Sequence, residues 1–177
     1  MQVNTKLSIL GLTTLIAIAG LIAWSVRPRI NLGTDVKPIP KNAPTLDTVD
    51  IEKILGVKQF RVIRHVSQVP QVVKESFSNF ADIPFDLADP GERISDDVVA
   101  PGMSSCRLVF LGVSDDSAVI YYEQGGIVRS LNVVVLWFGD GGHGWGAVLE
   151  HEPSPNDLSG MRAVIQSGQF QAWKGRR

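Results

Sequence analysis

Apolar residues follow three patterns along the chain, and each pattern predicts a different kind of element. Residues 7–26 form an unbroken run without a charge. Residues 69–80 carry apolar side chains at spacings of four and three, which is typical of one face of a helix. Residues 106–151 contain apolar runs separated by short turn sequences, which is typical of strands. The pattern therefore predicts a membrane segment followed by a mixed part of helices and strands.

The run at residues 7–26 has the composition of a transmembrane helix. At about 1.5 Å per residue, a helix of this length spans the roughly 30 Å hydrocarbon core of a bilayer. Residues 17–19 resemble a signal-peptidase site, so removal of residues 1–19 is an alternative. The apolar run continues past that site to Trp24, which favours a retained anchor that contacts the lipid bilayer.

Two rules predict opposite orientations for this run. Lys6 precedes it, whereas the basic residues that follow it are Arg27, Arg29, Lys37 and Lys41. The positive-inside rule alone would keep the rest of the chain in the cytoplasm. A short basic tail before a signal-like segment is instead typical of export. We expect an extracytoplasmic, periplasmic domain, with the cytoplasmic orientation as the alternative.

Proline punctuates the next segment, residues 27–47, at positions 28, 38, 40 and 44. Proline favours extended polyproline II, so this segment is expected to be a semi-rigid spacer. The expected organisation is an anchor or signal at residues 1–27, a linker at residues 28–47 and one globular domain at residues 48–177.

Four strands are expected in the second half of the domain, over residues 106–113, 118–124, 127–138 and 143–151. Connections as short as those between them join only antiparallel neighbours, which gives a four-stranded β-meander. Helices are expected over residues 49–55, 69–80 and 156–166, and a further strand is possible within residues 58–66. The predicted fold class is α+β, with one or two helices covering the meander.

Composition excludes several functions. The net charge of −1 gives no overall attraction for nucleic acid, and no nucleic-acid partner is expected. Cys106 is the single cysteine, so no disulfide forms within the chain. Cys106 opens an apolar run, where a cysteine usually acts as a small buried hydrophobe.

The stretch FGDGGHGWG, residues 138–146, contains the spelling G-x-G-x-x-G of a dinucleotide-binding loop. Such a loop needs a helix directly after it, but residues 143–149 alternate as a strand. We therefore expect a hairpin turn in which Asp140 and Gly141 supply the positive φ values, and no cofactor.

No catalytic or metal-binding motif is recognisable. His143 and His151 would lie roughly 26 Å apart on one strand, too far to share a metal ion. G-x-S-x-G, H-E-x-x-H and S-x-x-K are all missing from the sequence. An enzyme would need a site assembled from distant residues, such as His143 or His151 with Asp140, Ser130 or Glu123.

Aromatic residues on the expected meander offer the most plausible functional surface. The candidate ligand or partner residues are Tyr121, Tyr122, Trp137, Trp145 and His143. The function hypothesis is a non-catalytic, membrane-tethered binding or accessory domain that contacts an envelope protein or another envelope component. The alternatives are an envelope enzyme of hydrolase type and a structural subunit of an envelope complex.

Overall fold

The computed structural model describes residues 36–173, except residues 42, 96–101, 150–154 and 156. The chain divides into two compact units, Met1–Ile30 and Asn31–Arg177, and every described residue belongs to the second. The expected membrane segment at residues 7–26 lies outside the described residues. Within the described ranges, the helices are all too short or too polar to cross a bilayer.

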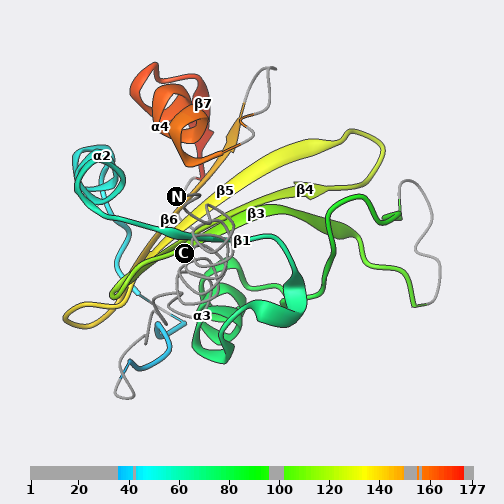
Figure 1. The fold of residues 1–177 in the computed structure, drawn as a ribbon, viewed down its shortest axis with the longest axis horizontal. Coiled ribbons are helices and arrows are strands. Elements are labelled where there is room, and N and C mark those ends of the chain that lie inside the picture. The colour runs from blue at the N-terminus through cyan, green and yellow to red at the C-terminus, as the bar shows by residue number, and fades with distance from the viewer. Residues whose placement is uncertain (1–35, 42, 96–101, 150–154, 156, 174–177) are drawn as a thin grey trace, which may run out of the picture. The chain divides into compact units, whose positions relative to one another are not determined.

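Four long antiparallel strands form the centre of the fold, as expected from their apolar runs (Figure 1). They are β3 (Cys106–Val113), β4 (Ser117–Gln124), β5 (Ser130–Trp137) and β6 (His143–Leu149). The third strand begins later than expected because Ile127 and Val128 lie in the hairpin loop and are exposed.

In the described part of the chain the sheet has seven strands, whereas the sequence predicted a meander of four and one further possible strand. β1 (Arg61–Ile63) pairs antiparallel with one edge of β3, and β7 (Phe170–Ala172) pairs antiparallel with β6. β2 (Leu87–Ala88) pairs parallel with β3. The path through the sheet is β1-β3-β4-β5-β6-β7, with β2 outside it. β1 lies within residues 58–66, where a strand was considered possible, whereas β2 and β7 are too short to show a two-residue period in the sequence.

Among the described residues, three α-helices and one 3₁₀ helix accompany the sheet. They are α2 (Thr48–Val57), η1 (Val66–Gln68), α3 (Gln71–Ala81) and α4 (Leu158–Gln166). The carboxylate of Asp47 accepts the Asp50 N–H at 2.9 Å and caps α2. Asp157 caps α4 in the same way by accepting the Gly160 N–H at 2.8 Å.

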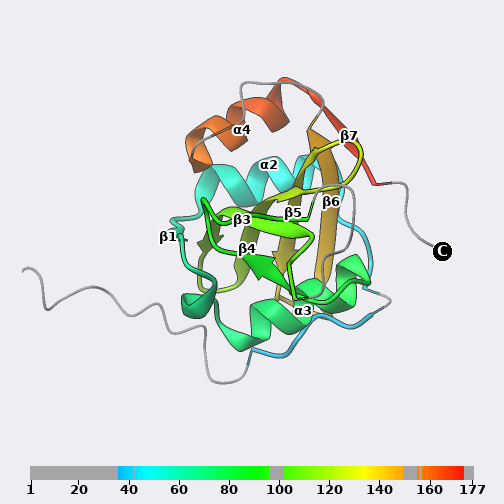
Figure 2. The same cartoon turned by 90° about the vertical axis from the view of Figure 1, so that its right-hand side faces the viewer.

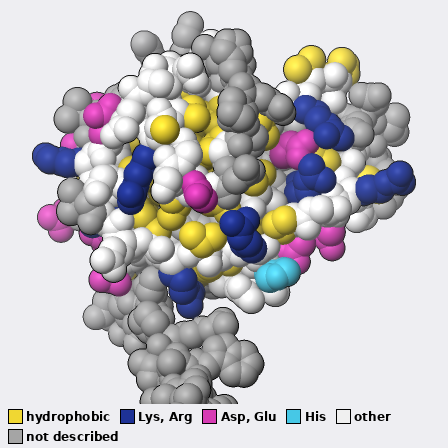
Figure 3. All heavy atoms as spheres, turned by 45° about the horizontal axis from the view of Figure 1, so that its top comes forward, with side chains coloured by type: hydrophobic (Ala, Val, Ile, Leu, Met, Phe, Trp, Pro, Cys, Tyr) yellow, Lys and Arg dark blue, Asp and Glu magenta, His cyan; other side chains and the backbone are white. Residues whose placement is uncertain are grey.

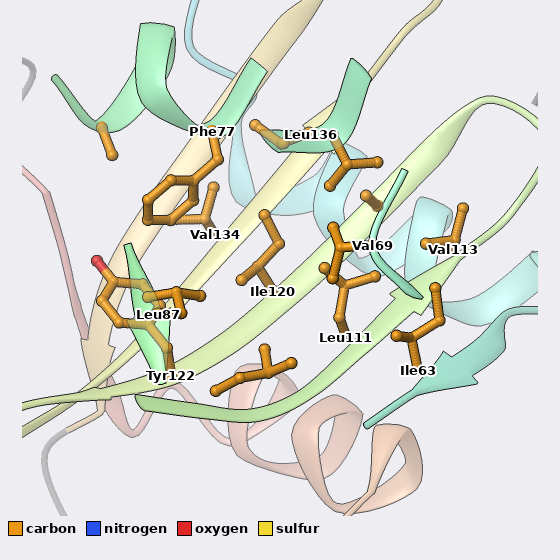
Figure 4. Close-up of a cluster of buried hydrophobic side chains, with 14 of the residues drawn as sticks. Ile63, Val69, Phe77, Leu87, Leu111, Val113, Ile120, Tyr122, Val134 and Leu136 are labelled. Atoms are coloured by element: carbon orange, nitrogen blue, oxygen red, sulfur yellow. The ribbon is translucent and has the colours of Figure 1, made fainter. Parts of the chain in front are cut away.

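Helices cover the sheet, as expected, and they lie on both of its faces. In Figure 2, α2 and α4 lie on one side of the strands and α3 lies on the other. The central strand β4 is accordingly buried from Ser117 to Glu123 without alternation. Figure 4 shows the α3 side, where Phe77 packs edge-on against Tyr122 with ring centroids 5.4 Å apart.

The glycines of the FGDGGHGWG stretch make a turn and leave room for rings. Gly142 N–H donates to Gly139 C=O at 2.7 Å, which closes the expected hairpin turn. Positive φ values occur at Gly141 (79°), as expected, and at Gly142 (65°). Asp140, where the other positive φ value was expected, does not have one. A Cβ at Gly144 would overlap the ring of Phe80, so this glycine is needed for packing.

Part of the proline-rich segment packs on the domain. Ile39 is 1% exposed, its N–H donates to Ser76 Oγ at 2.9 Å, and its C=O accepts from Asn79 Nδ2 at 2.8 Å. Leu46 N–H donates to Gly144 C=O at 2.9 Å. Residues 38–46 therefore belong to the folded unit in their described part, although the sequence assigns them to the linker.

Candidate ligand-binding site

Tyr121 and Tyr122 are buried on opposite faces of the sheet. Tyr121 is 0% exposed and packs against Phe110, with ring centroids 5.4 Å apart. Tyr122 is 1% exposed and lies on the α3 side against Phe77. Neither ring is available at the surface to a ligand or partner, because neighbouring residues of a strand point to opposite faces and both faces here are covered.

Trp145 is also a core residue. It is 3% exposed and lies in the cluster below α2 and α4. Its indole meets the ring of Phe170 edge-on, with centroids 5.2 Å apart. Three of the five candidate residues therefore support the fold and do not form a surface.

Trp137 and His143 come together in a pocket. They are paired partners at the start of the β5–β6 hairpin, and their ring centroids lie 5.0 Å apart at an interplanar angle of 37°. Both side chains are half-buried. They line a pocket of about 620 Å³ together with Pro44, Thr45, Leu46, Asp50, Lys53, Ile54 and Lys58.

Two segments far from the hairpin in sequence supply the walls of this pocket. Thr45 forms a parallel bridge with Gly144, which holds the segment at 44–46 beside β6. On α2, Lys53 and Ile54 lie three and four residues after Asp50, so both share a face of the helix with it. A Cβ at Gly139 would overlap the indole of Trp137, so glycine at that position allows the ring to take its place.

An ion pair borders the pocket at Lys58, whose ammonium binds the carboxylate of Asp116. Partial burial acts to raise the pKa of Asp116, but hydrogen bonds from Lys58, Ser117 and Ser114 outweigh it and hold this pKa below its ordinary value. Lys58 is thereby held at the end of α2, where its C=O also accepts from Arg162 at 3.2 Å.

His143 is half-buried in this pocket. Its Nδ1 is buried and has no hydrogen-bond partner among the described residues. Catalytic histidines are usually oriented by a carboxylate or carbonyl at the nitrogen that does not react. His143 is instead positioned by its packing against Trp137.

Most of the enzyme site suggested by the sequence does not assemble. Ser130 and Trp137 lie at opposite ends of β5, about 23 Å apart. Because His143 pairs with Trp137, Ser130 is also far from His143. Glu123 pairs with Leu131 near that same far end. His151 lies outside the described residues. In the described part of the chain, no group of three His, Cys, Asp or Glu side chains is placed to hold a metal ion.

Cys106 is a packed hydrophobe, as expected. It is 4% exposed within the cluster on the α3 side. Burial raises the pKa of its thiol by more than the hydrogen bond with Ser105 lowers it, and Asp86 adds a smaller increase. The thiolate that a nucleophile needs is therefore disfavoured.

The sequence indicated Trp137 and His143 as candidate residues, but not the two segments that form the walls of their pocket. The spacing of Asp50, Lys53 and Ile54 on an expected helix was the available signal, although it does not say which strand the helix faces. The contact between residues 44–46 and β6 joins positions about a hundred residues apart and has no local signature. No protein-family model, curated protein or solved structure compared with this chain gives a significant match.

Proposed function

We propose that this protein is a membrane-tethered binding domain that holds a small, planar and largely apolar ligand beside Trp137 and His143. The observation that carries the proposal is the pocket of about 620 Å³ that these two rings line. Pockets for small ligands commonly have volumes of roughly 300–1,000 Å³, apolar walls and a few polar groups. In this pocket Pro44, Leu46 and Ile54 supply the apolar walls.

The polar groups suggest the chemistry of the ligand. An indole presents a flat apolar face that favours stacking with an aromatic ring. The ammonium of Lys53 lines the same pocket on an exposed part of α2 and can meet an anionic group near the pocket mouth. These features favour an aromatic carboxylate or a similar planar anion.

Calorimetric titration of the full chain in neutral detergent micelles tests this function, with 2-naphthoate as the probe. We expect saturable binding that Trp137→Ala abolishes. Trp173→Ala is the matched control, because Trp173 stacks against Phe80 with ring centroids 6.1 Å apart, outside the pocket. Equal binding by the wild type and Trp137→Ala would contradict the proposal.

The tether is proposed from the uncharged run at residues 7–26. In this proposal residues 1–27 hold the domain at the membrane and the domain lies outside the cytoplasm. Protease added to intact spheroplasts should remove a C-terminal tag, whereas a cytoplasmic control protein with the same tag stays intact. Protection of the tag until the membrane is lysed would place the domain in the cytoplasm.

A further inference from the structure

A second hollow lies on the α2 and α4 side of the sheet, towards the β4–β5 hairpin. Its volume is about 930 Å³. We call it the sheet hollow and define it by its apolar floor and its charged rim. The floor contains Val109, Leu131 and Leu149, from three different strands, and the rim contains Arg64, Arg107 and Arg129. None of these residues lines the pocket beside Trp137.

A nearly buried carboxylate organises the rim. Glu123 is 8% exposed, and its two oxygens accept from Arg107 and, at 3.1 Å, from Arg129. Arg107 also donates to Glu92 C=O at 3.0 Å. A guanidinium has five N–H donors in a rigid fork, so it can bind several acceptors at the same time.

The charge of the rim is positive. Among the described residues that line the sheet hollow, the charged side chains are three arginines and one glutamate. Figure 3 shows Lys and Arg side chains gathered around an acidic side chain next to apolar surface. A rim of this composition favours carboxylates and disfavours cations.

The hairpin beside the hollow ends in two exposed apolar side chains. Ile127 is 94% exposed and Val128, which also lines the hollow, is 80% exposed. They follow Gly125 and Gly126 in the turn between β4 and β5. In Figure 1 this hairpin extends away from α2 and α4. An apolar tip beside a basic rim is typical of a contact surface.

The size of the floor suits a short stretch of chain. From β3 to β6 the floor crosses three strand spacings, which is about 14 Å. An extended peptide covers that distance with about four residues. Val109 and Leu131 on the floor are half-buried, so apolar side chains of an extended segment can pack on them.

We infer that the sheet hollow binds an extended acidic segment of a partner protein. Carboxylates of the segment meet Arg64, Arg107 and Arg129, and its apolar side chains lie on the floor and against Val128. Glu123 is a positioning residue in this arrangement, because it fixes two of the guanidinium groups and does not itself bind the segment.

The probe is a hexapeptide of alternating glutamate and valine that carries a neutral dye, and its counterpart has lysine in place of glutamate. Both are titrated by fluorescence anisotropy against the full chain in neutral detergent micelles. We expect the acidic peptide to bind at least about tenfold more tightly than the lysine peptide, and its binding to weaken as salt is added.

Variants of exposed residues separate the hollow from the rest of the surface. Arg64→Gln with Arg129→Gln should raise the dissociation constant at least about tenfold, and Val128→Asp should also weaken binding. Arg61→Gln is the matched control, because Arg61 is exposed on β1 and does not line the hollow. Arg107 is left intact so that Glu123, which loses the cation of Arg129 in this double variant, keeps one ion-pair partner.

Three results would overturn the inference. The first is equal binding of the two peptides, and the second is unchanged binding by the arginine and valine variants while the thermal unfolding curves show folded protein. In the third, phosphatidylglycerol vesicles, but not phosphatidylcholine vesicles, displace the acidic peptide from the wild type. That result would assign the surface to an anionic bilayer in place of a protein segment.

Discussion

Trp137 and His143 face each other across the two strands of the β5–β6 hairpin, with ring centroids 5.0 Å apart. They occupy the end of the sheet where α2 begins, and the segment at 44–46 lies beside them. Further along the same face the rings of Tyr121 and Trp145 are covered and the layers close. The pocket thus lies at the Trp137 end of β5, beside these covered rings.

Reversal of the charge at Lys53 should weaken anion binding without affecting the fold. Lys53 is exposed on α2, so Lys53→Glu is expected to leave the melting temperature nearly unchanged. The affinity for 2-naphthoate should fall about tenfold, while the affinity for uncharged 2-naphthalenemethanol stays the same. Calorimetric titration of both compounds checks this. An equal loss of affinity for the two would show that Lys53 does not bind the anionic group.

Gly144 should not tolerate a side chain. Gly144→Ala is expected to cost about 1–3 kcal/mol of unfolding free energy, because the added methyl would overlap Phe80. Gly56→Ala is the control, since a Cβ at this α2 position would meet nothing within 4 Å. Alanine there should be neutral or stabilising by up to about 1 kcal/mol. Urea denaturation measures both, and similar losses in the two variants would argue against the Phe80 contact.

Phe77 should be among the most costly residues to truncate. It is 0% exposed and contacts Tyr122 and Phe85, each with ring centroids 5.4 Å apart. Phe77→Ala is expected to lower the unfolding free energy by about 3–5 kcal/mol. Val62→Ala on β1, where the side chain is 41% exposed, should change it by less than about 0.5 kcal/mol. A loss below about 1 kcal/mol for Phe77→Ala in urea denaturation would contradict the packing described for α3.

Asp116 should contribute a pH-dependent part of the stability. Its pKa in the folded protein lies below the ordinary 3.8, so its contribution is full above that value and is lost as the pH falls through the folded pKa. Asp116→Asn is therefore expected to melt below the wild type at pH 7, by at most about 4 °C because the side chain is 40% exposed. Melting curves recorded between about pH 7 and 2 should converge at the acid end. A difference in melting temperature that grows as the pH falls would contradict a lowered pKa for Asp116.

Long periodic segments account for what the sequence predicts well. The apolar runs that became β3 to β6, and the stripe of Val73 and Phe77 on α3, carry their period over a whole element. β2 and β7 have two and three residues and cannot show a period, so the size of the sheet was underestimated. Their positions depend on pairing with neighbouring strands, which only the folded chain displays.

The candidate site was predictable only in part. Tyr121 and Tyr122 are adjacent in sequence, so at most one of them could line any single face of the sheet. The unbroken apolar run of β4 was the signal that both faces would be covered. Trp137 was correctly placed on a strand, but nothing local indicates that Leu46 and Ile54 lie beside it.

The most direct test of the proposed site is a nuclear magnetic resonance titration of the ¹⁵N-labelled full chain in neutral micelles with 2-naphthoate. We expect the largest shift changes at the indole N–H of Trp137 and at the backbone of Thr45, Leu46 and Lys53, which line the pocket. Saturation of these changes at a common dissociation constant would support the site. Unchanged signals at Trp137 and Leu46, or changes confined to residues outside the pocket, would contradict it.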